Sequence, residues 1–211
     1  MDTLEAIVKE IEAEGGIAVG ITSDVTSKES CEQMVEKVVG KYGCLDVLVN
    51  NAGFNGGPEY RQKIYDYDDD LWERILDCDL NGVYYCSKYA IRQMRKQETR
   101  GSIVNISSVA GVLPLRLQIA FTAAKAGVIN MSRAMAIELA DEGIRVNVIC
   151  PGSIMFEGTK KLFYNNKETA EKMMAAIPMH RPGEPDDIGC AACFLASDKA
   201  SSYITGDVQV I

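Results

Sequence analysis

The sequence predicts an α/β fold in which helices cover both faces of a doubly wound parallel sheet. Helical patterns alternate with short strand-like runs along the chain. The strand-like runs at residues 45–49, 102–107 and 145–150 are almost continuously apolar. Such runs indicate strands that are buried on both faces, which is typical of parallel sheets covered by crossover helices.

The composition is that of one globular domain, because 47% of the 211 residues are hydrophobic and 25% are charged. A formal net charge of −8 without a Lys/Arg cluster argues against nucleic acid or an anionic membrane as partner. No apolar run approaches the ~20 residues of a membrane-spanning helix, and the acidic start does not resemble a signal peptide. The seven cysteines follow no disulfide framework, so we expect reduced thiols in a cytoplasmic protein.

The first elements follow from spacing and capping residues. Apolar residues at helical spacing predict a helix over residues 4–11, and a short strand is expected over 17–22. A second helix over 31–42 begins after a segment rich in capping residues. Residues 45–49 then form a strand that ends in an Asn-Asn-Ala-Gly turn.

The later elements alternate in the same way. An acidic run at residues 66–70 favours the N-terminus of the helix that follows it and extends to about Met94. Beyond the strands named above, we expect helices over 121–140, near 157–176 and over 185–197, and a last strand at 207–211.

The order of elements departs from that of a complete doubly wound sheet. Such sheets open with a strand, a glycine-rich turn and a helix whose N-terminus holds a cofactor pyrophosphate. This sequence opens on a helix and contains no G-x-G-x-x-G motif. We therefore expect residues 1–211 to form a single, incomplete domain that lacks its first βαβ unit and its C-terminal tail.

Five motifs occur in a fixed order along the chain. They are Asn50-Asn51-Ala52-Gly53 after a strand, Ser107-Ser108 at the end of another, Lys125 on a helix, Pro151-Gly152 after the next strand, and Arg181-Pro182-Gly183 before a later helix. In this order and spacing they resemble the short-chain dehydrogenase/reductase family over essentially the whole chain. The resemblance implies a Rossmann-like sheet and the NAD(P)-dependent interconversion of ketones and secondary alcohols.

The resemblance also implies a set of cofactor contacts. NAD or NADP would contact Asp24, Val25, Asn51, Ala52, Gly53, Lys125, Pro151, Gly152 and Ile154. Simpler interpretations exist for two of these segments, because an Asn-Ala-Gly turn can merely end a strand and Asp24 can merely cap a helix. The residue that selects NAD or NADP follows the second strand of this fold, which this sequence does not contain.

The catalytic set of the family is Ser, Tyr, Lys and Asn. A Tyr and a Lys four positions apart share one helix face, and the ammonium favours the phenolate form of the tyrosine. The tyrosine then exchanges a proton with the substrate oxygen while the nicotinamide moves hydride. Ser108 matches this set, with Ser107 as a one-residue alternative, and Lys125 matches as well.

Three positions depart from the family pattern. The Tyr position is Phe121, which has no proton to give, and the Asn position, seven residues after Trp72, is Asp79. Asn81 is close in sequence but falls about 200° around a helix. The position that is usually Thr, four residues after Gly152, is Phe156. Loss of a general acid costs typically about 10²–10⁴ in rate, so we expect an impaired enzyme.

Two functions are therefore open. One is an oxidoreductase acting on a small-molecule carbonyl or alcohol, and the other is a non-catalytic family member that binds a ligand or joins an oligomer. A homo-oligomer, dimer or tetramer, is expected because a missing central strand pair exposes apolar surface. In the family these strands lie between 17–22 and 45–49. Either the two segments close up or a gap remains, and we favour closure because open edges aggregate.

Other motifs favour structural roles. Cys190 and Cys193 have no second pair of cysteines, so they are interpreted as the core face of a helix, and His180 as a loop residue; we expect no metal site. Residues 156–174 fall where the family places its substrate lid. The apolar side chains of this stretch, Phe163, Tyr164, Met173 and Met174, fit a ligand or core packing about equally well.

Overall fold

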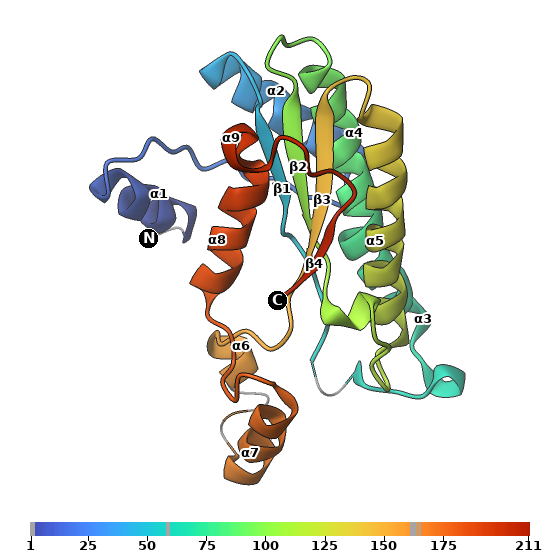
Figure 1. Ribbon diagram of the computed structural model, residues 1–211. Helices are drawn as coiled ribbons and strands as arrows, with labels where there is room; N and C mark the ends of the chain where they lie inside the picture. Colours follow the sequence, from blue (N-terminus) through green and yellow to red (C-terminus); the bar gives the residue numbers. More distant parts are fainter. Residues whose placement is uncertain (1–2, 58–59, 161–163, 165) are drawn as a thin grey trace.

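A four-stranded parallel sheet lies at the centre of the molecule, with helices on both faces (Figure 1). The computed structural model describes residues 3–57, 60–160, 164 and 166–211. The strands lie in the spatial order β1 (Val47–Asn50), β2 (Gly101–Ile106), β3 (Ile144–Cys150) and β4 (Val208–Val210). Every pairing between them is parallel, which confirms the predicted sheet.

The described residues form the helices α1 (Thr3–Ala13), α2 (Lys28–Tyr42), α3 (Asp69–Leu76), α4 (Gly82–Met94), α5 (Ile119–Leu139), α6 (Glu157–Thr159), α7 (Lys167–Ala176), α8 (Pro185–Ala196) and α9 (Asp198–Ser201). Helices α4 and α5 pack on one face of the sheet, around the fully buried Ile103 and Val146. Helix α8 covers the other face, where Leu195 meets Val104 and Ile149.

Capping residues account for where two of these helices begin. The side chain of Ser27 accepts a hydrogen bond from the backbone N–H of Ser30 at the start of α2. The carboxylate of Asp68 accepts one from the backbone N–H of Leu71 at the start of α3. Both contacts satisfy N–H groups that a helix leaves unpaired at its first turn. The acidic run therefore favours the N-terminus of α3, as predicted.

The single long helix predicted up to Met94 is interrupted. Helix α3 passes through the π-helical turn η3 (Asp77–Asn81) before α4 begins. A π turn inserts an extra residue and changes which side chains face inward, and such turns are frequent at functional sites. Here it carries Asp79 to a fully buried position.

The strand predicted at residues 17–22 is absent, and the predicted closure of the gap is wrong. These residues form an irregular segment between α1 and α2, in which Ile17 is 84% exposed. Without a strand beside it, an exposed segment leaves its backbone groups to side chains and water, and β1 is the edge of the sheet among the described residues. Val47 and Val49 on this edge are 37% and 45% exposed. Helix α1 lies apart from the sheet and has no buried residue (Figure 1).

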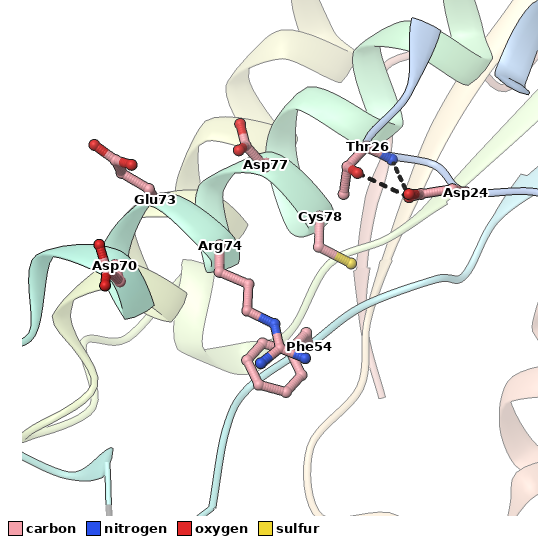
Figure 2. A pocket seen from close by; sticks show the side chains of 8 residues that line it. All are labelled: Asp24, Thr26, Phe54, Asp70, Glu73, Arg74, Asp77 and Cys78. Carbon is pink, nitrogen blue, oxygen red and sulfur yellow. Dashed lines mark hydrogen bonds between the residues drawn. The ribbon is translucent and has the colours of Figure 1, made fainter. Parts of the chain in front are cut away.

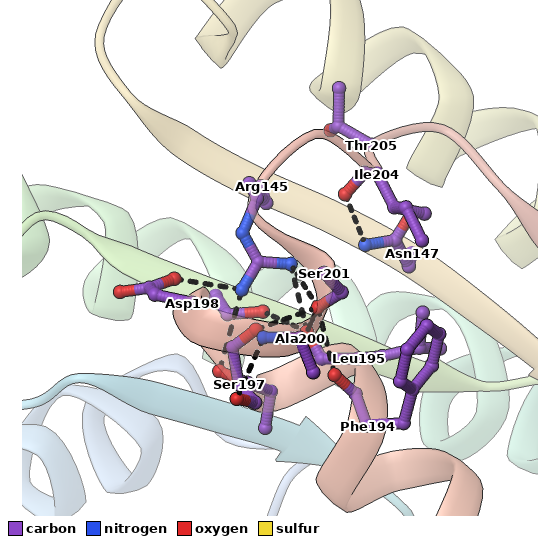
Figure 3. A network of polar contacts seen from close by, with 12 residues as sticks. Arg145, Asn147, Phe194, Leu195, Ser197, Asp198, Ala200, Ser201, Ile204 and Thr205 are labelled. Carbon is purple, nitrogen blue, oxygen red and sulfur yellow. Dashed lines mark hydrogen bonds and ion pairs between the residues drawn. The ribbon is translucent and has the colours of Figure 1, made fainter.

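The C-terminal elements are held to the sheet by a buried guanidinium group (Figure 3). From β3, Arg145 donates hydrogen bonds to the carbonyl oxygen of Leu195 at 2.8 Å and to the Asp198 carboxylate at 2.8 Å. Asn147 on the same strand donates to the carbonyl oxygen of Ile204 at 2.9 Å. Carbonyl groups at the end of α8 are thereby satisfied by a cation, which suits the negative end of a helix.

The helical region predicted near residues 157–176 appears as α6 and α7. Tyr164 between them shares a hydrogen bond of 2.8 Å with the hydroxyl of Ser153. Met173 and Met174 on α7 are half-buried. Phe163 lies outside the described residues.

Candidate functional site

The carboxyl ends of the parallel strands bring most of the predicted site residues to one edge of the sheet. Strand β1 leads into Asn51, Ala52 and Gly53, and β2 leads into Ser107 and Ser108. The N-terminal half of α5 passes over this edge and carries positions 121 and 125. Crevices at this edge are where sheets of this kind bind ligands.

Lys125 and Asp79 form a buried ion pair at the centre of this edge. The Lys125 Nζ lies 3.2 Å from Asp79 Oδ2, and the two side chains are 6% and 0% exposed. The same ammonium donates a hydrogen bond to the carbonyl oxygen of Ile106 at 3.2 Å. Asp79 Oδ1 accepts a hydrogen bond from the backbone N–H of Phe54 at 2.6 Å. The pair therefore links α5, β2, η3 and the turn after β1.

The turn after β1 approaches this ion pair at Gly53. A Cβ atom at position 53 would lie 3.4 Å from both Lys125 Nζ and Asp79 Oδ2. This is an ordinary van der Waals distance, so the turn lies directly against the ion pair at position 53.

Phe121 covers the ammonium with an apolar ring. Its centroid lies 5.6 Å from Lys125 Nζ, and its ring packs against the apolar cluster formed with Leu71 and Ile75. A cation at this distance from a phenyl face is attracted to the ring. The ring supplies no hydroxyl, so position 121 can neither give nor take a proton.

The two adjacent serines have different surroundings. Ser107 is buried, and its hydroxyl donates a hydrogen bond of 2.8 Å to the backbone carbonyl of Lys125. Ser108 is half-buried and caps the short 3-10 turn η4 (Val109–Gly111), where its Oγ accepts from the backbone N–H of Ala110 at 3.1 Å. As an acceptor in this contact, the Ser108 hydroxyl keeps its own proton for a second hydrogen bond. Ser108 is therefore the better placed of the two to contact a substrate oxygen.

The Asp24 end of the site borders a hollow of about 550 Å³ (Figure 2). The carboxylate of Asp24 accepts hydrogen bonds from the backbone N–H and the hydroxyl of Thr26, at 2.9 and 2.8 Å. These contacts hold the pKa of Asp24 below its ordinary value. Across the hollow, the Arg74 guanidinium stacks on the Phe54 ring, 4.0 Å from its centroid.

A second, smaller hollow of about 210 Å³ runs along the open side of β1. Val25, Asn51 and Ala52 line it together with Cys86. Val25 also packs closely on α4, because a Cβ at Gly82 would come within 3.0 Å of it. Four predicted cofactor contacts, from Asp24 to Ala52, therefore border two hollows at the same edge of the sheet.

The residues after β3 lie beside the serine turn. The backbone N–H of Val109 donates to the carbonyl oxygen of Pro151 at 3.0 Å, and the N–H of Gly152 donates to Ile211 at 2.7 Å. Ile154 is held by a parallel bridge to Gly183. The motif around Gly183 thus anchors the segment that follows Gly152.

The chain was compared with protein families, curated sequences and solved structures. A family model described as enoyl-(acyl carrier protein) reductase matches residues 1–211. The 3-oxoacyl-[acyl-carrier-protein] reductase FabG of Thermotoga maritima is 40% identical over 208 residues, which cover 98% of this chain and 80% of that protein. The chain belongs to the short-chain dehydrogenase/reductase family.

Further members of the short-chain dehydrogenase/reductase family support this assignment. Glucose 1-dehydrogenase 2 of Bacillus subtilis is 36% identical over 208 residues, 97% of this chain and 76% of its own length. The crystal structure of NAD⁺-bound xylitol dehydrogenase superposes with a TM-score of 0.89 at 32% identity, covering 99% of this chain and 83% of that one. A structure of ElxO with NADP bound also reaches 0.89, at 30% identity, covering 100% and 84%.

The sequence did not predict the buried hydrogen bonds beneath the site of this short-chain dehydrogenase/reductase. Asn50 donates hydrogen bonds to Ser87 Oγ at 3.0 Å and to Asn105 Oδ1 at 2.7 Å, and Asn105 donates to Ser132 Oγ at 2.8 Å. The chain of contacts is buried and ties β1 and β2 to α4 and α5. An asparagine inside each of two apolar strands was the available signal, because a buried amide needs partners.

Two predictions about cysteine and histidine positions have different outcomes. Cys190 and Cys193 are exposed, so their predicted core role is wrong. Helix α8 instead buries Leu195, with Ile188 partly buried, at a spacing that leaves both cysteines on the solvent side. His180 lies in a bend, as predicted for a loop residue. Within the described ranges, no three His, Cys, Asp or Glu side chains gather in a way that could hold a metal ion.

No helix among the described residues is long and apolar enough to cross a membrane.

Proposed function

We propose that the chain is an impaired NAD(P)-dependent oxidoreductase for a small-molecule ketone or secondary alcohol. Its site is proposed to keep the substrate serine and the cofactor contacts but to lack the proton donor. The observation that carries this proposal is the Phe121 ring, which lies over Lys125 where the family resemblance places a tyrosine.

The residues at this edge fit two ends of a nicotinamide dinucleotide. The two hollows beside Asp24 and Val25 would take the adenine end, and Asn51 to Gly53 would lie along the ribose nearer the nicotinamide. Gly53 keeps that path free of a side chain beside Lys125. The bound cofactor would supply or accept hydride. The described residues include no glycine-rich turn at a helix N-terminus for the pyrophosphate, so we expect weak binding.

The residues of the site would bind the substrate and exclude water. Ser108 would donate a hydrogen bond to the substrate oxygen, and the apolar ring of Phe121 would exclude water from the reacting carbon. Among the described residues, Lys125 is held in its pair with Asp79 and has no hydroxyl partner through which to pass a proton. The missing general acid is expected to lower the rate by about 10²–10⁴.

One related structure supports cofactor binding in a protein that has lost a tyrosine hydroxyl. One solved structure is that of a tyrosine-to-phenylalanine variant of ElxO with NADPH bound, at a TM-score of 0.88 and 30% identity. A family member that has lost a tyrosine hydroxyl can therefore still hold its cofactor. By analogy, Phe121 need not prevent binding in this chain.

A second candidate is a non-catalytic subunit, which the same two substitutions favour. Phe121 and Asp79 both remove catalytic groups, while the fold and the hollows persist. Exposed apolar side chains on α4 and α5, Tyr84 at 46% and Ile137 at 81%, favour a helix-mediated homo-oligomer. In that case the chain would bind a ligand or join an assembly of active relatives.

Two measurements on the purified 211-residue chain test the proposal. Titration with NADH and NADPH, followed by nicotinamide fluorescence, is expected to show saturable, weak binding. No binding up to about 1 mM, the upper end of usual KM values, would contradict the cofactor site. Oxidation of NADPH with a panel of ketones is then compared with the Thermotoga maritima relative under the same conditions.

The expected rate is at least about 10² below that of the relative. Brisk turnover that Ser108→Ala abolishes would contradict the proposed impairment, because another group would then donate the proton. Saturable binding with no turnover on any ketone favours the non-catalytic subunit. Sedimentation velocity on the same sample measures whether that subunit self-associates.

A further inference from the structure

The charged groups of Asp79 and Lys125 pair with each other inside the protein. Lys125 Nζ is 3.2 Å from Asp79 Oδ2 and 3.2 Å from the carbonyl oxygen of Ile106. Asp79 Oδ1 accepts a hydrogen bond from the Phe54 N–H. Among the described residues, Asp79 Oδ2 accepts no hydrogen bond and pairs with the Lys125 ammonium. Both side chains are more than nine-tenths buried, so water does little to screen the two charges.

The backbone around the pair holds the carboxylate in place. Asp79 lies in the π turn between α3 and α4, which directs it inward, and the backbone N–H of Phe54 after β1 donates a hydrogen bond to it. A neutral asparagine at position 79 would leave the ammonium as an uncompensated charge. An aspartate makes the pair neutral as a whole.

We propose that Asp79 is a positioning residue. Its carboxylate offsets the electrostatic effect of the Lys125 ammonium on the side chain at position 121. This proposal rests on the proposed function, because it concerns the same proton-transfer position. An isolated cation within about 6 Å lowers the pKa of a neighbouring acid by about 1–3 units, whereas a nearby carboxylate opposes that effect. Restoring a tyrosine at position 121 would therefore not restore an activated phenol while Asp79 remains.

The other titratable groups near position 121 are few among the described residues. Cys78 adjoins Asp79, and its pKa is raised mainly by burial. Tyr67 packs in the same apolar cluster as Phe121, and its pKa is also raised mainly by burial. Arg74 lies beyond the Phe54 ring, on the side of the larger hollow. Lys125 and Asp79 are therefore the charged pair that dominates this position.

The test titrates an introduced tyrosine, by its ultraviolet absorbance, in matched pairs of proteins. The spectrum of Phe121→Tyr is measured against the unaltered chain, and Phe121→Tyr/Asp79→Asn against Asp79→Asn, so that the nine native tyrosines cancel. The introduced tyrosine is expected to ionise at least about one pH unit lower in the Asp79→Asn background. Adding Lys125→Met to both proteins of the second pair is expected to remove the difference between the two backgrounds in the pH at which the introduced tyrosine ionises.

Equal titration of the introduced tyrosine in the two backgrounds would overturn the proposal. If Asp79→Asn does not fold, Phe121→Tyr alone still decides: an ionisation near or above the ordinary value of about 10 supports cancellation, and one well below about 9 overturns it. Neither measurement needs cofactor or turnover. A failed NADPH titration therefore contradicts the proposed function and leaves the charge measurement intact, and the reverse also holds.

Discussion

At the scale of single residues, this site is defined by substitutions that change chemistry while preserving packing. Phe121 keeps an aromatic ring in contact with the Leu71 cluster but removes the hydroxyl. Asp79 keeps nearly the shape of an asparagine but adds a charge, which Lys125 accepts as an ion pair. Breaking such a buried pair leaves an uncompensated charge and costs about 3–5 kcal/mol. Under the proposed role of Asp79, positions 79 and 121 are coupled through Lys125.

Close backbone approach at Gly111 positions the serine turn against α5. A Cβ at position 111 would lie 2.7 Å from the backbone carbon and oxygen of Lys125, which cannot rotate away. Gly111→Ala is expected to destabilise the protein by about 1–3 kcal/mol, as overpacking does. Gly40→Ala is the matched control, because nothing lies within 4 Å of its Cβ in α2.

Urea unfolding of both variants, followed by circular dichroism, measures the difference. The control is expected to gain up to about 1 kcal/mol, because alanine favours a helix over glycine. A Gly111→Ala variant as stable as the control would show that η4 does not pack tightly on the backbone at Lys125.

At the scale of elements, the strands and most helices were predictable because their signals are local. Almost continuously apolar runs marked β2 and β3, and an acidic run marked the start of α3. The segment at 17–22 has the composition of a strand but no partner, so its structure depends on a neighbour that local sequence does not describe.

The site was predictable in position but not in interactions. Motif spacing placed Ser108, Phe121, Lys125 and Asp79 in one site, and the structure brings the last three together. The ion pair depends on the π turn that carries Asp79 inward, and no spacing rule predicts such a turn. The buried amide contacts of Asn50 and Asn105 depend on strand register, which only the assembled sheet determines.

A capping box at the start of α8 makes the stability of that helix depend on pH. The Asp187 carboxylate accepts hydrogen bonds from the Glu184 backbone N–H at 2.8 Å and from Arg181 at 3.2 Å. These contacts lower the pKa of Asp187 from its ordinary value of 3.8. A lowered carboxylate pKa stabilises the fold above the unfolded-state value, and the contribution is lost as pH falls through the folded-state value.

The melting temperature of Asp187→Asn is therefore expected to lie below that of the parent at neutral pH, and the gap to shrink below pH 3.8. Asp186→Asn serves as the control, because Asp186 is in the same first turn but outside the capping box. Thermal melts of the three proteins across this pH range provide the measurement. A gap that is constant with pH would rule out the carboxylate as its cause.

At the scale of the whole molecule, β1 forms an open edge of the sheet among the described residues, beside an apolar hollow. Val47 and Val49 are partly exposed there, and the hollow of about 210 Å³ runs along the same side. An open strand edge is a template for pairing with another chain. Apolar helix surface around Ile137 offers a second, separate route to self-association.

A lysine on the open edge separates these two routes. Val49→Lys is expected to slow the time-dependent aggregation of the chain, because a charged side chain on an edge strand disfavours pairing with another strand. Ile137→Lys is the matched control, since it places the same charge on α5 at a residue that is 81% exposed. Light scattering and thioflavin fluorescence follow aggregation, and circular dichroism checks that both variants fold. If Ile137→Lys slows aggregation and Val49→Lys does not, association proceeds through the helix surface, and the open edge of β1 is not the site at which copies meet.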